Sequence, residues 1–363
     1  MSTENTASKK TVKIAVDTLG GDKSPNANID GTIAALKKHD DLAVIMFGDS
    51  ETIEKRIDEL GESALKSRIE IVHSPNAVDG NDKPIDAIRL KRDSSMIQAI
   101  KQLRENGELS ALVSTGATGV LVGGCILRIG RIKGVRRPAF CPILPTMNGS
   151  IVGICDSGAS VECSAEQLRQ NAVMASAYIK TVYGIESPRV ALLNVGVEEE
   201  KGDDLRREAY ALLKAEPSIN FVGNMESRDL LSGKYDIVVC DGFSGNVLVK
   251  SHGGACLEML KKLKKDISSS FINKIGALFM YKMFMKEKEF MNYQNYGGSV
   301  LLGLDKVVVK GHGSSGAHAF EICIDQAYKM VKSDFCGKMA AEIGVSDNNI
   351  KEKNEQQGDN GNV

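Results

Sequence analysis

The sequence predicts an α/β fold in which helices cover both faces of a doubly wound, mostly parallel sheet, an α/β/α sandwich. Short apolar runs alternate with longer segments of helical periodicity along most of the chain. The apolar runs carry consecutive Val and Ile rather than an alternation of apolar and polar residues, which is typical of strands covered on both faces. Glycine-rich turns follow many of these runs, as expected where parallel strands end at a ligand site.

Each expected strand is such an apolar run. The strands are predicted at Val12–Asp17, Leu42–Phe47, Ile69–His73, Ala111–Ser114, Ile151–Cys155, Arg189–Val195, Ile237–Cys240 and Lys306–Lys310. Helical periodicity is clear in Ala165–Tyr178 and Asp203–Leu213. No repeat or Pro/Ser-rich linker divides the chain, so we expect a single domain over residues 11–345, with residues 261–296 as an amphipathic helical excursion. Residues 1–10 and 346–363 are polar and predicted to be disordered tails.

Composition excludes several classes of protein. The 363 residues carry a formal net charge of -1 and no Trp, so neither a basic field nor a stacking surface points to nucleic acid. No apolar run reaches about 18 residues, and the polar start lacks the apolar region of a secretory signal. The eight cysteines form no C-x-x-C pair. We expect reduced thiols in a cytoplasmic protein without a metal.

Five strand-to-helix turns form the candidate site. In the first, Gly20 and Gly21 allow close approach of a ligand, while Asp17 and Asp22 are placed to orient it or to bind a cation. A tight turn in which Asp22 caps the following helix explains the same residues. The second turn is Ser114-Thr115-Gly116-Ala117-Thr118-Gly119, whose small and hydroxyl residues at a helix start favour an anion or simply cap the helix.

The third turn holds Asn194 at a strand end and Lys201, a cation suited to phosphate, although a solvated charged loop is the usual interpretation of such a run of acids. In the fourth, Asp241 leaves a very apolar strand and Asn246 lies in the first helical turn. A carboxylate in that position needs a partner or a function.

The fifth turn, Gly311-His312-Gly313-Ser314-Ser315-Gly316, matches G-x-G-x-x-G, but no later strand completes a dinucleotide-binding unit. We interpret it as an anion cradle with His312 as a donor or proton source; hydrogen bonding within the turn is the plainer role for His312. No P-loop and no G-x-S-x-G motif occurs. The five turns together predict a small anionic ligand held by backbone N–H groups.

At these turns the sequence resembles the PlsX family, the acyl-acyl-carrier-protein:phosphate acyltransferases of bacterial phospholipid synthesis. The resembling stretches include IAVDTLGGDKSPNANIDG from Ile14, LVSTGATGV from Leu112, LLNVGVEEEKGDD from Leu192, CDGFSGN from Cys240 and VVVKGHGSSGAHAF from Val307. The resemblance covers the chain from about Lys13 to Met330. It departs from the family pattern at Ile154–Cys163, where Cys155, Ser157, Ser160 and Glu162 replace other residues, and at Gly316.

The resemblance implies a fold related to phosphate acetyltransferases and isocitrate dehydrogenase-like proteins. It also implies a homodimer, no required cofactor, and a cytoplasmic protein with peripheral membrane contact. The implied substrates are an acyl-acyl carrier protein and inorganic phosphate, and a downstream glycerol-3-phosphate acyltransferase is a candidate partner.

For this reaction we expect the Ser114–Gly119 turn and the turn at Gly313, Ser314 and Ser315 to hold phosphate. His312 and Asn246 are expected to serve the oxyanion or the leaving thiolate, with Asp241 and Asp17 orienting these donors. A covalent acyl-cysteine at Cys240 is the rival mechanism, although a neighbouring carboxylate raises a thiol pKa.

Two surfaces suggest partners. The basic residues Arg128, Arg131, Lys133, Arg136 and Arg137 follow one another with no acid between them, as a dock for an acidic carrier or as a solvated loop. Residues 261–296 combine Lys with Phe, Ile and Met, which fits a bilayer surface or a dimer-packing helix pair.

Three rival functions stay open. A phosphate acetyl- or butyryltransferase would use acyl coenzyme A, a metal- and NAD-dependent decarboxylating dehydrogenase would need Asp ligands and a complete nucleotide site, and a membrane scaffold would need no catalysis.

Overall fold

A computed structural model describes residues 11–290, 293–344 and 346. Its contacts divide the chain into two compact units, Met1–Gly130 with Leu304–Cys336 (unit 1) and Arg131–Gly303 with Gly337–Val363 (unit 2). We predicted a single domain over residues 11–345. The division into two units does not test that prediction. The predicted tails, residues 1–10 and 347–363, lie outside the described residues.

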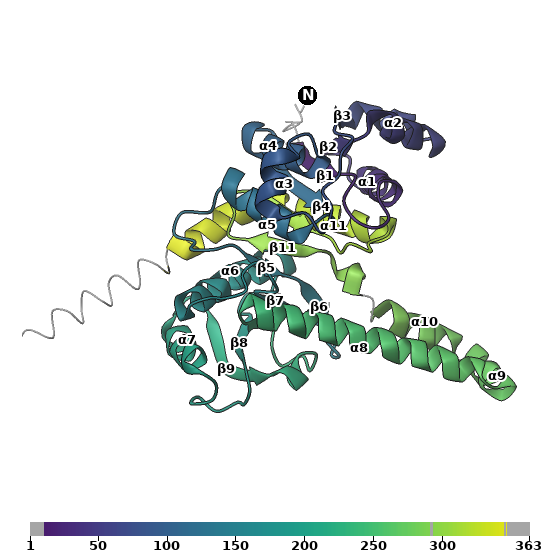
Figure 1. The fold of residues 1–363 in the computed structure, drawn as a ribbon. Coiled ribbons are helices and arrows are strands. Elements are labelled where there is room, and N and C mark those ends of the chain that lie inside the picture. The colour runs from purple at the N-terminus through teal and green to yellow at the C-terminus, as the bar shows by residue number, and fades with distance from the viewer. Residues whose placement is uncertain (1–10, 291–292, 345, 347–363) are drawn as a thin grey trace, which may run out of the picture. The chain divides into compact units, whose positions relative to one another are not determined.

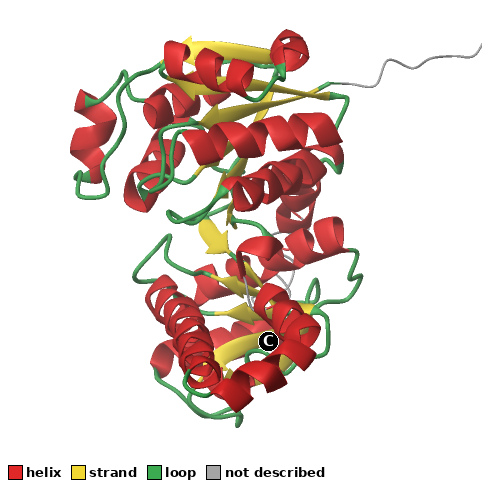
Figure 2. Cartoon of the chain, turned by 90° about the vertical axis from the view of Figure 1, so that its right-hand side faces the viewer, coloured by secondary structure: helices red, strands yellow, loops and turns green. Residues whose placement is uncertain are grey.

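Unit 1 is built on parallel strands in the order β3-β2-β1-β4-β12. Helices α1 and α11 pack on one face, and α3, α4 and α5 on the other (Figures 1 and 2). The elements are β1 (Val12–Asp17), α1 (Asn26–Lys38), β2 (Leu42–Gly48), α2 (Ser50–Glu59), η1 (Ser63–Arg68), β3 (Ile69–His73), α3 (Pro84–Leu90), α4 (Ser95–Glu105), β4 (Leu109–Ser114), α5 (Thr118–Arg128), β12 (Val307–Lys310) and α11 (Ala317–Lys332).

Unit 2 contains a second, mostly parallel sheet in the order β6-β7-β10-β8-β9, in which only β6 runs antiparallel to its neighbour. The antiparallel pair β5–β11 belongs to the same unit. Its elements are β5 (Ala139–Cys141), β6 (Ile143–Pro145), β7 (Ile151–Cys155), α6 (Ala165–Tyr183), β8 (Arg189–Asn194), α7 (Asp204–Ala215), β9 (Asn220–Glu226), η2 (Ser227–Asp229), β10 (Ile237–Val239), α8 (Gly242–Ser268), α9 (Phe271–Phe279), α10 (Tyr281–Phe290), η3 (Tyr293–Tyr296) and β11 (Ser299–Leu302).

The predicted α/β class with parallel sheets is confirmed, and every predicted strand is present. The central strands β1, β4 and β12 are buried on both faces, which explains their continuous Val and Ile. The parallel strands belong to a sheet in each unit rather than to one. Helix α6 begins at a capping box of Ser164 and Gln167 and ends at Gly184, whose φ of 70° is left-handed.

The C-terminal segment is held in unit 2 by a buried ion pair. Arg169, which is only 2% exposed, binds Glu216, and the Ser346 hydroxyl donates to Glu216 at 2.7 Å. Ser346 was predicted to begin a disordered tail, because its polar neighbours give no sign of these partners. The other residues of the predicted tail, 347–363, lie outside the described residues, so the tail stays a prediction.

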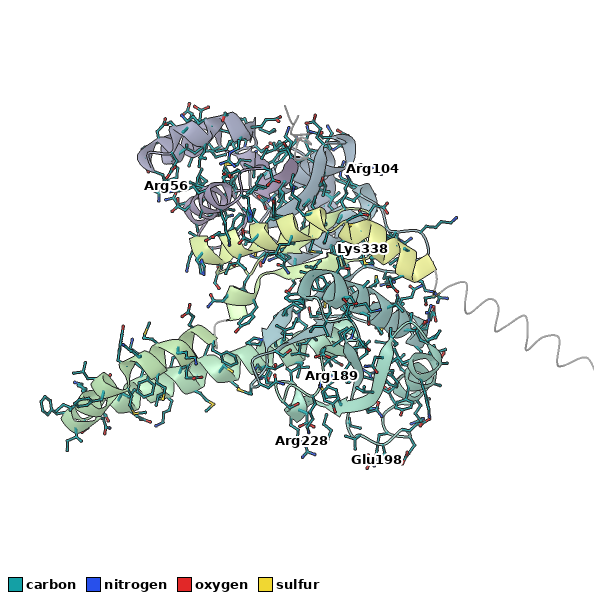
Figure 3. The ribbon with its side chains drawn as sticks, turned by 180° about the vertical axis from the view of Figure 1, so that it is seen from behind. Arg56, Arg104, Arg189, Glu198, Arg228 and Lys338 are labelled. Atoms are coloured by element: carbon teal, nitrogen blue, oxygen red, sulfur yellow. The ribbon has the colours of Figure 1, made fainter. Side chains whose placement is uncertain are left out.

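Helices α8, α9 and α10 project from the sheet of unit 2 (Figure 1). Figure 3 shows side chains standing around this projection. Its large apolar residues are exposed, with Phe271 at 78% and Phe279 at 86%. The predicted excursion over residues 261–296 contains the end of α8 together with α9, α10 and η3, and α8 itself begins earlier, at Gly242. No helix in the described ranges is both long and apolar enough to cross a bilayer.

Candidate active site

Asp17, the last residue of β1, joins three elements of unit 1. Its carboxylate accepts from the hydroxyls of Ser95 and Ser114, each at 2.6 Å, and from the Leu19 N–H at 3.3 Å. Burial raises the pKa of Asp17, and these donors oppose that shift because they favour the carboxylate. Asp17 therefore holds together the ends of β1 and β4 and the start of α4.

The first two turns are tied together directly. The Thr115 hydroxyl donates to Gly20 O at 2.7 Å, and the buried amide of Asn28 donates to the same oxygen at 2.9 Å. A Cβ on Gly20 would lie 2.5 Å from Gly116 N, so no side chain fits there. The close approach of the two turns thus requires glycine at this position.

Lys310 connects the second turn to the fifth. Its Nζ donates to Thr115 O at 3.3 Å and to Gly311 O at 2.5 Å. Burial lowers the pKa of Lys310 to about 8, although Asp17 and Asp22 oppose the shift. A buried ammonium therefore lies directly behind two of the turns that were predicted to hold an anion.

The fifth turn also contacts the first, because Asp22 N donates to Gly313 O at 2.7 Å. Within this turn, the exposed His312 has its Nδ1 2.8 Å from the Ser314 hydroxyl, and Ser315 N donates to His312 O. His312 thus makes hydrogen bonds within its own turn, the plainer of the two roles predicted for it. Its catalytic role stays a prediction.

Helix α5 starts without a side-chain cap. Its N-cap residue, Ala117, offers none, and Thr118 and Gly119 are exposed. Simple capping by a hydroxyl therefore does not explain this turn. The first N–H groups of the helix and its dipole are suited to an anion instead. We call the Asp17–Asp22, Ser114–Gly119 and Gly311–Gly316 turns the unit 1 cradle.

In unit 2, Asp156 organises the loop where the sequence departs from the family pattern. Its carboxylate accepts from the N–H groups of Phe140, Gly158, Ala159 and Ser160 at 2.8–3.0 Å. Burial raises the pKa of Asp156, and these N–H groups oppose that shift. The loop thus keeps its central carboxylate although several neighbouring residues have changed.

Asp241 caps α8 and has a cationic partner. Its carboxylate accepts from the Ser244 N–H and hydroxyl, both at 2.8 Å, and pairs with Arg206. Burial disfavours the charge, but Ser244 and Arg206 outweigh burial and hold the pKa of Asp241 below its usual value. The partner that the sequence required for this carboxylate is therefore Arg206, which no local pattern had indicated.

Asn246 lies beside the Asp156 loop, and its side chain donates to Ser157 O at 3.1 Å. Gly158 has a φ of 126°, and a Cβ there would lie 2.7 Å from the Asn246 amide nitrogen. Asp241 and Asn246 thus both lie near the start of α8, with Asp241 as its N-cap and Asn246 against the Asp156 loop.

Packing of α8 against this loop gives a stability prediction. A Cβ on Gly245 would lie 1.9 Å from Asp156 O, whereas one on Gly254 in the same helix meets nothing within 4 Å. Gly245→Ala should lower the free energy of unfolding by about 1–3 kcal/mol. Gly254→Ala should raise it by up to about 1 kcal/mol through helix propensity. Thermal unfolding followed by circular dichroism compares them, and equal shifts would contradict the packing.

Asn194 and Lys201 lie on one loop. The Asn194 side chain donates to Lys201 O at 3.0 Å and accepts from Val195 N at 2.8 Å, so its amide shapes the loop. Lys201 is exposed. A Cβ on Gly202 would contact both Asn194 and Arg206 Cβ, which places this loop next to the arginine that binds Asp241.

Cys240 does not have the surroundings of a nucleophile. Burial raises the pKa of its thiol well above the usual value, and Asp156 and Asp241 raise it further. Its Sγ donates to Asp156 O at 3.2 Å. These observations argue against the acyl-cysteine mechanism.

Of the predicted basic residues, Arg131, Lys133, Arg136 and Arg137 are exposed on a loop of unit 2, while Arg128 ends α5 in unit 1 and is partly buried. Within the described part of the chain, no group of three His, Cys, Asp or Glu side chains is arranged to hold a metal ion.

The predicted residues thus form two clusters, the unit 1 cradle and, in unit 2, the ends of β8 and β10. That all five turns make one site stays a prediction. Sequence reasoning missed Asn28, Ser95, Asp156, Arg206 and Lys310. Of these, only Lys310, a charged residue ending a strand of consecutive valines, carried a local signal that could have been used.

Solved structures define the class of fold. A phosphotransacetylase from Streptococcus pyogenes aligns over 89% of this chain and 94% of its own, with a TM-score of 0.59 and 17% identity. The EutD phosphotransacetylase from Staphylococcus aureus gives a TM-score of 0.53 over 91% of this chain and 94% of its own, at 16% identity. The chain therefore has the phosphotransacetylase fold.

Sequence relatives then define the family. The family described as fatty acid synthesis protein matches residues 12–338. A phosphate acyltransferase of Streptococcus uberis is 42% identical, covering 90% of this chain and 96% of its own. One from Clostridium perfringens is 39% identical over 92% and 97%. The chain belongs to this family, the PlsX phosphate acyltransferases.

Proposed function

We propose that this phosphate acyltransferase takes a fatty acyl group from an acyl carrier protein and transfers it to inorganic phosphate, giving an acyl phosphate for phospholipid synthesis. The unit 1 cradle carries the proposal. It combines backbone N–H groups, an uncapped helix start and the buried cation of Lys310, which together suit a small dianion. This arrangement needs no cofactor for acyl transfer.

In the proposed reaction a phosphate oxygen attacks the thioester carbonyl. A C–O bond forms, the C–S bond breaks, and the carrier thiolate leaves with the electron pair and takes up a proton. Holding phosphate in line lowers the barrier through orientation. His312 and Asn246 are our candidates for stabilising the oxyanion or protonating the thiolate. One oxyanion donor is typically worth about 3–4 kcal/mol. Asp17 and Asp241 act as positioning residues through the contacts described above.

The remaining parts of the proposal concern partners. The exposed cations Arg131, Lys133, Arg136 and Arg137 suit an acidic carrier protein. We further propose a cytoplasmic homodimer that delivers its product to a glycerol-3-phosphate acyltransferase at the membrane.

Phosphate-dependent loss of the carrier thioester, with the acyl phosphate trapped by hydroxylamine, tests the function. Turnover with acyl-acyl carrier protein and none with acetyl coenzyme A supports the proposal. Turnover with short acyl coenzyme A alone would indicate a phosphate acetyl- or butyryltransferase. No turnover with either donor would favour a membrane scaffold.

Peripheral membrane contact is proposed through the exposed apolar residues of α9 and α10. Phe271 and Phe279 are 78% and 86% exposed, and burying a phenylalanine side chain is worth about 1.5–3 kcal/mol. The double change Phe271→Ala and Phe279→Ala should lower binding to anionic lipid vesicles at least about ten-fold in co-sedimentation.

Leu90→Ala on α3 is the control, because Leu90 is 79% exposed but lies in unit 1. If the double variant binds vesicles normally but becomes monomeric in size-exclusion chromatography, the apolar surface serves a dimer instead.

A further inference from the structure

Unit 1 contains a cationic pocket beside the start of α4 that the proposed reaction does not use. It has a volume of about 330 Å³ and is lined by Arg92, Ile97, Gln98, Lys101 and Arg128. Ile97 forms a buried apolar part of its wall. The other side chains are polar or cationic, and no acidic side chain is among these described lining residues. The pocket is therefore built to receive negative charge.

The cations of this pocket are poorly neutralised. Arg92 donates its Nε–H to the backbone oxygen of Arg89 at 3.0 Å, and Lys101 lies 3.9 Å from Glu105 in an exposed pair. Arg128 Nε is buried and has no hydrogen-bond acceptor among the described residues. Arg128 therefore brings to the pocket wall a guanidinium Nε–H that no described residue satisfies.

Some residues that line the pocket are neighbours in sequence of residues that contact the cradle. Ile97 and Gln98 directly follow Ser95, which donates to Asp17, and Met96, whose Cε would lie 2.3 Å from a Cβ on Gly116. One turn of α4 thus carries contacts to the cradle and lining of the pocket. A molecule bound in the pocket would therefore contact the helix that supports the cradle.

We propose that this pocket is an anchor point for the acyl donor's carrier, and that it binds carboxylates on the acidic surface of that protein. The inference rests on the proposed function, because it takes the donor to be an acidic carrier protein. The predicted basic dock included Arg128. The pocket adds Arg92 and Lys101 to it, although both lie far in sequence from the basic loop at residues 131–137. Charge complementarity selects this occupant, since three clustered cations without a buried carboxylate favour an acidic partner.

Charge reversal tests the anchor. The double change Arg92→Glu and Lys101→Glu should raise KM for the acyl-carrier donor by about ten-fold or more with little change in kcat. KM for acyl-pantetheine, a neutral donor without the carrier, and KM for phosphate should stay unchanged. Lys55→Glu, an exposed residue of α2, is the control for the same change of charge.

Direct titration of the carrier without its acyl group gives a readout that does not need turnover. The wild-type protein should bind it more weakly as salt rises, and the double variant should bind it at least about ten-fold more weakly at low salt. Unchanged carrier binding in the double variant overturns the anchor. So does an equal rise of KM with the neutral donor or with phosphate, since the pocket would then serve the chemistry or a small anion.

Failure of the two proposals can be told apart. A wild-type protein that turns over only acyl coenzyme A refutes the carrier as donor. A wild-type protein that uses the carrier, with a double variant that uses it equally well, refutes the anchor alone.

Discussion

Replacing Asp17 by asparagine is expected to lower kcat for acyl transfer by about 100- to 1,000-fold, the range seen when a preorganised polar group of an active site is removed. Both carboxylate oxygens accept hydroxyl hydrogens, from Ser95 and Ser114, and the Ser114 hydroxyl itself accepts from Gly116 N at 3.1 Å. An amide NH₂ in place of one oxygen forces one hydroxyl to turn. Because Leu19 N also donates to Oδ1, the NH₂ is expected at Oδ2, so the hydroxyl that reorients is that of Ser114, which holds Gly116 N in the second turn.

The measurement is steady-state kinetics with thermal unfolding as a companion. Asp58→Asn on α2 is the control, because it makes the same chemical change at an exposed carboxylate. The expectation fails if Asp17→Asn keeps kcat within about three-fold of wild type. It also fails if activity is lost only at temperatures where the variant unfolds.

The second large effect is expected at Lys310. Lys310→Met should raise KM for phosphate by about 100-fold, because it removes a buried positive charge behind the cradle and two hydrogen bonds to turn carbonyls. KM for the acyl donor should change little. Phosphate should raise the melting temperature of the wild type but not that of the variant.

Lys306 provides a matched control just before the first residue of the same strand. Its Nζ donates to Leu109 O at 2.8 Å, so Lys306→Met also deletes a lysine-to-carbonyl hydrogen bond, but one away from the cradle. Lys306→Met should leave KM for phosphate unchanged. Equal effects of the two variants would mean that Lys310 acts only through stability.

The pH dependence of phosphate binding follows from the same lysine. With its pKa lowered to about 8, Lys310 is charged below that pH and loses its proton as pH rises through it. Affinity for phosphate should therefore fall between about pH 7.5 and 9.5 in wild type, where phosphate is already mostly a dianion. This alkaline loss should be absent in Lys310→Met, whose weak binding does not depend on that proton.

Strands buried on both faces were the easiest elements to predict. The bounds of the buried strands β1 and β7 agree with the expectation residue for residue, and so do those of β3, an edge strand that is only partly buried. Four strands, β5, β6, β9 and β11, were missed. Strand β9 is half-exposed and pairs with β8 alone, so it lacks continuous Val and Ile, and β5 and β6 have only three residues each.

Site residues could be predicted only where a polar or charged side chain lies at the end of an expected strand. Asp17 and Ser114 end β1 and β4, and Asp241 comes soon after β10, each where a turn was expected. Ser95 and Arg206 act on these residues from distant helices, so no local pattern could show them. Their partners are set by packing of α4 and α7, which only the folded chain reveals.

Helix α8 carries Asp241 and Asn246 near its first residue, and its last turn leads into the apolar helices α9 and α10. Its 27 residues span about 40 Å at the usual rise of a helix. In mechanical terms it is a lever, because a tilt of about 5° moves the far end by about 3 Å. Holding α9 and α10 in place would therefore also limit the orientations of the first residues of α8, where Asn246 lies.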